Sequence, residues 1–326
     1  MENISAVNNQ TLNSSELQSV LGEGGHVALN VIGLIVLSLP MVLSNGFVII
    51  VLLIDKTTVS ALRITLINTL AAAMTTGLGF TVWHLTHIMR RAGLIGDQSL
   101  GLATRAAAGF FVGSFLLRSI ALCVLSVVVF SVIKKGPPKK KAVWCLSAVV
   151  GGELVFIVIF GSLQASDMAI KSIVFLDGYH VYLVSSNFGR YLIVSVGLVV
   201  EISSKTVTFT FAALAFRLVK RRVSVAVGTG IRKAMLKFLI STMILNVITI
   251  FINLCLTASL FRDSLESVQQ NSRGTLALTY FGQIVIALST ILVPILLTVQ
   301  FRSVSTTVKE KFGCGKVTPT IHPSLS

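Results

Sequence analysis

The run VALNVIGLIVLSLPMVLSNGFVIIVLLI, at residues 27–54, contains no charged side chain. A helix that rises about 1.5 Å per residue needs about 20 apolar residues to cross a hydrocarbon layer about 30 Å thick. The run exceeds that length. Residues 27–54 therefore predict a transmembrane helix, and the same criterion applies along the rest of the chain.

Six further runs meet this criterion. The seven predicted spans are 27–54, 61–88, 107–133, 142–164, 188–216, 234–260 and 275–299. Composition agrees, because 54% of the 326 residues are hydrophobic and only 12% are charged. A soluble domain carries about 25% charged residues, which provide its polar shell. We therefore expect an all-α protein, a bundle of seven transmembrane helices.

The basic residues predict how the bundle crosses the membrane. A net charge of +15 can indicate nucleic-acid binding, but these charges gather in short loops between apolar runs. No zinc-finger spacing or RNA-binding signature is present, so we expect no nucleic-acid partner. With the N-terminus outside, eighteen of the 27 Lys and Arg residues lie on the inner side and seven on the outer side. Because cytoplasmic loops concentrate Lys and Arg, we expect a multi-pass protein with its N-terminus outside the cell.

The N-terminal tail fits this orientation. Its first 25 residues contain no Lys or Arg, and they hold glycosylation sequons at Asn3, Asn9 and Asn13. No cleavable signal peptide is predicted, because the first apolar run starts late and is long enough to span. We expect a glycosylated extracellular tail at residues 1–26, the seven-helix domain at 27–300, and a cytoplasmic segment at 301–326.

Short motifs in three spans carry a family resemblance. The first span contains Ser44-Asn45-Gly46-Phe47-Val48, the second contains Asn68-Thr69-Leu70-Ala71, and the seventh contains Pro294 near its inner end. These resemble the Gly-Asn-x-x-Val core, the Asn-Leu-Ala stretch and the Asn-Pro-x-x-Tyr proline of rhodopsin-like (class A) G-protein-coupled receptors. The resemblance implies a plasma-membrane receptor that couples to a heterotrimeric G protein and needs no cofactor.

The chain also departs from the family. Met74 stands where the family has an acid in its second helix, and Val128-Val129-Phe130 stands where it has Asp-Arg-Tyr. Val293 and Leu297 occupy the Asn and Tyr positions around Pro294. The chain is therefore either a divergent member or a seven-helix protein of another family.

The segment after the seventh span predicts a short amphipathic helix. Its apolar residues follow 3/4 spacing and share one face: Phe301, Val304, Val308 and Phe312. Lys309, Glu310 and Lys311 take most of the other side. Such a helix lies along the membrane interface and resembles the family's eighth helix, with Cys314 at its end as a candidate palmitoylation site.

Ionisable residues inside the spans are functional candidates, because charge in a membrane is costly unless it is paired or wetted. They are Arg118, Glu153, Glu201 and Lys205. Glu201 and Lys205 are four residues apart on one helix face, and one interpretation is that they simply satisfy each other. Arg118 cannot lose its proton, so it needs a partner. We expect a buried network in which Arg118 meets Glu153 or Glu201.

The receptor hypothesis assigns two sites. The ligand candidates are Phe111, Phe115, Arg118 and Glu201, and span-end residues His84 and His87 also lie in the outer half. Short loops and an apolar bundle favour a small, apolar ligand, as in chemosensory receptors. The G-protein-facing candidates are Arg217, Lys220, Arg221, Arg222, Arg232 and Lys233. For the aromatic pair and for the basic residues, packing and membrane topology are the alternative interpretations.

Other function classes remain open or are disfavoured. The spans contain no Gly-x-Ser-x-Gly, paired aspartates or His/Asp cluster, so we expect neither an enzyme nor a metal site. The predicted seventh span contains no lysine for a retinal Schiff base, which disfavours an opsin. A secondary transporter that uses the same buried charges is the main alternative, although no internal repeat is visible. A receptor-like protein that has lost coupling is another.

Overall fold

The structure is a computed structural model, and it describes residues 22–55, 58–135, 148–149, 152, 170–176, 179–184, 187–221, 233–245, 247–248, 251 and 272–313. Within these ranges it describes side chains except at residues 22–26, 97–112, 115, 170–198, 201, 221 and 272–280.

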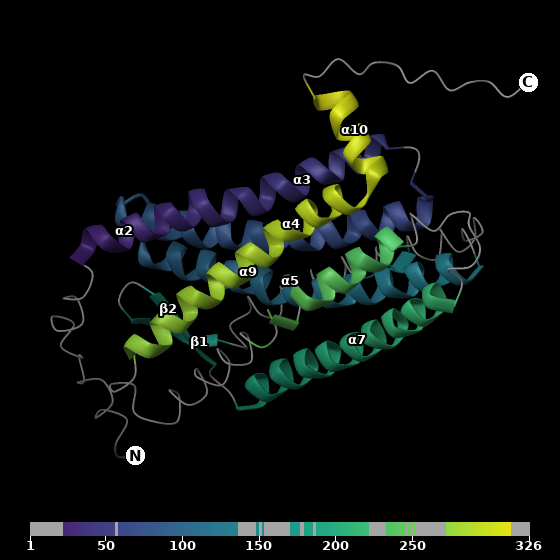
Figure 1. Cartoon of the computed structure of the whole chain (residues 1–326). Helices are drawn as coiled ribbons and strands as arrows, with labels where there is room; N and C mark the ends of the chain where they lie inside the picture. Colours follow the sequence, from purple (N-terminus) through teal and green to yellow (C-terminus); the bar gives the residue numbers. More distant parts are fainter. Residues whose placement is uncertain are drawn as a thin grey trace, which may run out of the picture.

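Long helices dominate the described chain and lie side by side (Figure 1). The elements are α2 (Gly22–Ile32), the π-helix η1 (Gly33–Ser38), α3 (Leu39–Ile54), α4 (Ser60–Arg91), α5 (Asp97–Lys135), β1 (Ile170–Leu176), β2 (Tyr179–Val184), α7 (Asn187–Arg221), α9 (Ser272–Gln300) and α10 (Arg302–Phe312). Residues 233–245 form a further helical segment, which we call helix 233–245. The strands lie near the end of the bundle where α2 begins, and α10 lies at the other end, called the α10 end below.

Five helices in the described ranges are long and apolar enough to cross a membrane. They cover Val27–Ile54, Ser60–Arg91, Leu116–Lys135, Ile202–Lys220 and Phe281–Gln300. They match the first, second, third, fifth and seventh predicted spans, so apolar helices long enough to cross a membrane are confirmed at these five spans. Helix 233–245 begins the sixth predicted span. The fourth lies almost wholly outside the described residues, so the count of seven and the orientation stay predictions.

The first span contains a wide turn just before Pro40. Proline lacks an N–H and its ring crowds the carbonyl four residues earlier, which disturbs an α-helix. Here η1 takes up the disturbance: the Leu39 N–H bonds back to the Leu34 carbonyl, and the Ser38 hydroxyl donates to the Gly33 carbonyl at 3.2 Å. These bonds keep the backbone satisfied where no water is available, so one continuous helical rod runs from Gly22 to Ile54.

A tight turn makes α4 and α5 neighbours. Gly93 has φ of 71°, the left-handed conformation that glycine adopts without a Cβ penalty. Its N–H bonds to the Arg90 carbonyl, and the Leu94 N–H bonds to the Met89 carbonyl. This is a Schellman termination, which ends α4 and reverses the chain.

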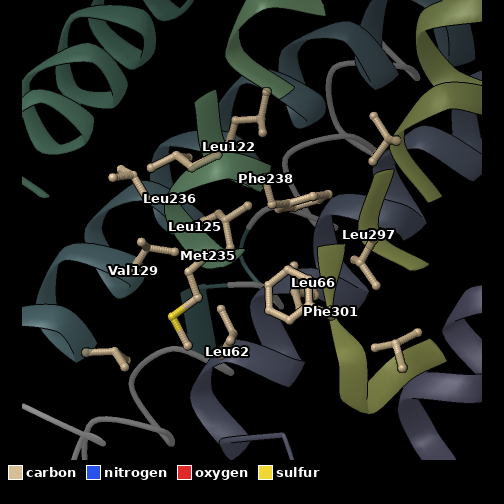
Figure 2. Packing of buried hydrophobic residues seen from close by; sticks show 14 of the residues in the cluster. Leu62, Leu66, Leu122, Leu125, Val129, Met235, Leu236, Phe238, Leu297 and Phe301 are labelled. Carbon is tan, nitrogen blue, oxygen red and sulfur yellow. The ribbon is translucent and has the colours of Figure 1, made fainter. Parts of the chain in front are cut away.

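A large apolar cluster fills the α10 end, where α4, α5, helix 233–245 and α9 meet (Figure 2). Leu66, Leu125 and Leu297 are fully buried in it. Phe238 and Phe301 meet edge to face with their ring centroids 5.8 Å apart. The cluster joins the last turn of α9 to the inside of the bundle.

The outside of the bundle is apolar as well. Leu43, Val199 and Phe216 are more than half exposed, although a soluble protein would place polar residues on such a surface. The buried positions inside the bundle include many serine, threonine and asparagine side chains. Apolar residues outside and polar residues inside are the arrangement expected where lipid surrounds the helices.

Helix α10 is amphipathic, as the sequence predicts. Val304 is fully buried, Phe301 is buried beside it, and Lys309, Glu310 and Lys311 are exposed. Phe312 contacts Phe47 of α3 edge to face, at a centroid distance of 5.1 Å. The helix is interrupted at Phe301, whose φ of −100° and ψ of 104° are extended, and α10 continues in a different direction from α9.

A short hairpin is added to the helical architecture. β1 and β2 pair antiparallel, with Val174 opposite Val181 and an irregularity between Ile170 and Ser172. The hairpin falls in the predicted loop between the fourth and fifth spans. The helical fold class was predicted from the sequence, but this pair of strands was not.

Candidate functional site: a buried polar network

Arg118 of α5 lies inside the bundle and reaches α9. Its side chain is 2% exposed, and Nη1 donates to Thr290 Oγ1 at 3.0 Å and to Ser289 Oγ at 3.3 Å. Both hydroxyls donate to the Ile286 carbonyl, at 2.8 Å from Ser289 and 2.7 Å from Thr290. Their oxygen lone pairs are therefore available to accept from the guanidinium. The result is a directed chain of hydrogen bonds from α5 into the backbone of α9.

The backbone carbonyl of Thr290 is also contacted by a side chain of α3. Pro294, four residues later, has no N–H to give the Thr290 carbonyl. Asn45 Nδ2 lies 3.4 Å from that carbonyl oxygen and 2.7 Å from the Met41 carbonyl. Asn45 and Thr290 are both fully buried. Thr290 is therefore the point where α3, α5 and α9 are tied together.

The residue after Arg118 connects α5 to α7. Lys205 Nζ donates to the hydroxyl of Ser119 at 3.0 Å, and Ser119 is 2% exposed. One turn before Arg118, Ser114 accepts a hydrogen bond from Thr76 of α4 at 3.1 Å. Over little more than one turn, α5 therefore makes polar contacts with α4, α7 and α9.

The predicted acid partners of these cations stay untested. Glu153 lies outside the described residues, and the Glu201 side chain does too, although its backbone lies in α7. Arg118 and Lys205 have interactions beyond those given above. The Arg118–acid network and the Glu201–Lys205 pair therefore remain predictions. The structure adds Ser289 and Thr290, two adjacent hydroxyls one turn before Pro294 that the sequence analysis did not single out.

The other predicted ligand residues are only partly described. Phe111 and Phe115 lie in α5, but their side chains are outside the described set. His84 and His87 are buried near the end of α4. His84 Nδ1 lies 3.1 Å from Asn30 Oδ1, and its ring stacks on Phe80. Gly33 lies against this ring so closely that a Cβ atom there would overlap it.

Three predicted G-protein-facing residues are described with their side chains. Arg217, Lys220 and Lys233 are exposed, and we call these three the basic patch. The side chain of Arg221 lies outside the described set, as do residues Arg222 and Arg232. Asn3, Asn9, Asn13 and Cys314 also lie outside it, so glycosylation and palmitoylation stay predictions.

A group of hydrogen-bonded polar side chains joins the α3–α4 loop to α10. Thr58 donates to the carboxylate of buried Asp55, and its hydroxyl lies 3.3 Å from Ser303 Oγ in α10. Arg63 Nη1 donates to the Asp55 carbonyl at 2.8 Å. These bonds set where α10 leaves the bundle.

The buried polar chemistry described here can hold helices together and respond to a change in their packing. Among the described side chains, no three His, Cys, Asp or Glu residues are grouped so that they could hold a metal ion. Fold and network together define a helical membrane protein with an internal polar network. No protein-family model matches the sequence, and a comparison with curated proteins finds no match.

Proposed function

We propose that the chain is a divergent rhodopsin-like receptor that passes the binding of a small, apolar ligand to a heterotrimeric G protein. One observation carries the proposal. Asn45 and Pro294, which both belong to motifs of the family resemblance, meet through the Thr290 carbonyl. Two motif positions about 250 residues apart therefore share a physical task, and this supports the resemblance.

The amphipathic helix α10 supports the same proposal. α10 follows α9 directly, buries one face and keeps its charged face exposed. The basic patch of Arg217, Lys220 and Lys233 is exposed on α7 and helix 233–245. We assign the α10 end to the cytosol and the patch to contact with the G protein, whose acidic surfaces it would attract.

The missing Asp-Arg-Tyr motif has a replacement made of aromatic contacts. Val129 is buried in the apolar cluster, and Phe130 meets Phe211 of α7 edge to face at 5.3 Å. Lys134 Nζ lies 5.5 Å from the centroid of the Phe130 ring. In this proposal, the Phe130–Phe211 contact holds the inner ends of α5 and α7, in place of the charged contact that the Asp-Arg-Tyr motif makes in the family. Basal activity therefore depends on Phe130.

The test is G-protein activation in cells, measured at rest and across a panel of small apolar compounds, at matched surface expression. The test variant carries Lys220→Gln and Lys233→Gln. The matched control carries Arg90→Gln and Arg91→Gln, which removes two exposed charges from the far end of α4. Activation that falls in the first variant and persists in the control supports a coupled receptor.

Silence against all G-protein classes, with normal surface expression, contradicts the proposal. The buried cations Arg118 and Lys205 would then favour the transporter alternative, which uptake assays would examine. Activation that is equally reduced in both variants would also count against the basic patch, because a general loss of charge would explain it.

A further inference from the structure

Pro294 divides α9 into two parts. A proline removes one backbone hydrogen bond and crowds the preceding turn, so helices bend most easily at that point. In α9 the affected carbonyl belongs to Thr290. The part before the proline and the part after it can therefore change their relative angle without breaking a regular hydrogen-bond ladder.

The turn before Pro294 is attached to α3 and α5. Arg118 donates to Ser289 and Thr290, and Asn45 donates to the Thr290 carbonyl. All four side chains are at most 3% exposed. Inside a membrane bundle no bulk water replaces a lost partner, so these bonds resist separation.

The turn after Pro294 is attached to helix 233–245 as well. Leu297 and Phe301 belong to the apolar cluster at the α10 end, and Phe301 packs on Phe238. Gln300 Nε2 donates to Ser241 Oγ at 3.3 Å. Phe238 and Ser241 both lie in helix 233–245. The part of α9 after Pro294 is thus held by helix 233–245 in addition to α3, α4 and α5, which share the apolar cluster.

We infer that Arg118 and Asn45 form a latch on Thr290 that sets the angle of α9 at Pro294. Releasing the latch moves the end of α9, and α10 with it, relative to helix 233–245. The inference rests on the contacts around Thr290 and holds whether or not the chain couples to a G protein. A packing role for these bonds without a latch predicts a different result: lower stability with the same angle.

The experiment measures one distance across the α10 end in the purified, full-length protein. Spin labels are placed at Lys309→Cys in α10 and Lys237→Cys in helix 233–245, two exposed positions, after the 4 native cysteines are replaced. Thr290→Val removes the hydroxyl that accepts from Arg118 and keeps the side-chain shape. Arg118 itself is left intact, because it has other interactions that its removal would disturb.

Thr298→Val is the matched control. Its hydroxyl donates to the Pro294 carbonyl at 2.9 Å, within α9, so this change removes a hydroxyl from the same helix without touching the latch. We expect Thr290→Val to shift the distance distribution by about 2 Å, the scale of helix shifts in switching proteins. Ser289→Ala combined with Thr290→Val should shift the distribution further. The distribution of Thr298→Val should be the same as that of the labelled protein without these changes.

A Thr290→Val distribution that overlays the parent overturns the latch, even where the variant melts at a lower temperature. Equal shifts in Thr290→Val and Thr298→Val overturn it too. If the double variant does not fold, Ser289→Ala and Thr290→Val are compared singly. The measurement needs no G protein or ligand, so its outcome is separate from that of the proposed function.

Discussion

Asn45 of α3 supplies the donor that Pro294 removes from α9. The Asn45 amide nitrogen lies 3.4 Å from the Thr290 carbonyl oxygen, which Pro294 leaves without its usual helical N–H. Because Asn45 is fully buried, no solvent competes for this contact. The pairing explains why a proline is tolerated inside a membrane-spanning helix, near its end.

This pairing predicts a coupling between the two residues. Asn45→Ala should lower stability by about 1 kcal/mol, the scale of one buried hydrogen bond. In a Pro294→Ala background the restored backbone N–H can serve the Thr290 carbonyl, so Asn45→Ala should have a smaller effect there. Some effect should persist, because Asn45 also bonds the Met41 carbonyl. Thermal unfolding in detergent of the four proteins gives the coupling, and equal effects in both backgrounds would refute it.

Gly33 should be intolerant of substitution because His84 occupies the space of its missing side chain. Gly33→Ala should destabilise the protein by about 1–3 kcal/mol, the usual scale of overpacking. Gly46→Ala is the control, since a Cβ atom there meets only Met74 Sδ at an ordinary 3.7 Å. Melting temperatures compare the two, and similar values would show that the His84 ring moves aside freely.

Arg118 should be coupled to one of two acids. Removing the acid that pairs with a buried guanidinium leaves an uncompensated charge, which destabilises by about 3–5 kcal/mol. We therefore expect either Glu153→Gln or Glu201→Gln to be strongly destabilising alone and much less so in an Arg118→Leu background. Double-mutant cycles on expression and melting temperature identify which acid it is. Two additive cycles would mean that Arg118 depends on hydroxyls and backbone carbonyls instead.

Helix α10 should depend on its aromatic contact with α3. An edge-to-face pair contributes about 0.5–1.5 kcal/mol beyond the area it buries. Phe312→Ala should therefore increase the mobility of a spin label at position 309, and Phe47→Ala should have the same effect. The two changes together should add little, because both remove one contact. Thr306→Ala, at an exposed position on the same helix, should leave the label unchanged.

The orientation can be checked through the N-terminal tail. If the tail is outside, replacing Asn3, Asn9 and Asn13 with Gln one after another should raise gel mobility in steps, and enzymatic deglycosylation should abolish the differences. Asn8→Gln is the control, because Asn8 is followed by Asn9 and Gln10 and forms no sequon. Mobility that is the same in all of these proteins would contradict the extracellular tail.

Much of the fold could be predicted because its signals are local. Apolar length identified the helices, although their ends moved: the helix predicted at 107–133 runs from Asp97 to Lys135. Its first turns are too polar for a hydropathy criterion, yet they continue an unbroken helix. The 3/4 spacing of Phe301, Val304 and Phe312 likewise predicted α10, because one helix face is set by sequence spacing alone.

The candidate site could be predicted only in part. Charge inside a span marked Arg118, since that rule needs no partner. The hydroxyls that it contacts could not be found in this way, because serine and threonine are common in membrane helices and often bond only to their own backbone. Among the described residues, the Thr298 hydroxyl bonds only to its own helix backbone. The Thr290 hydroxyl bonds to its own helix backbone as well, but it also accepts a hydrogen bond from Arg118 of α5.

The sequence by itself determined that this protein crosses a membrane as helices, that Arg118 sits inside one of them, and that an amphipathic helix follows the last. Each of these depends on residues within a few turns of one another. Only the tertiary structure decided that Arg118 meets residues 171 and 172 positions further along the chain. Helical periodicity specifies which face a side chain occupies, but the neighbouring helix on that face is chosen by packing of the whole bundle.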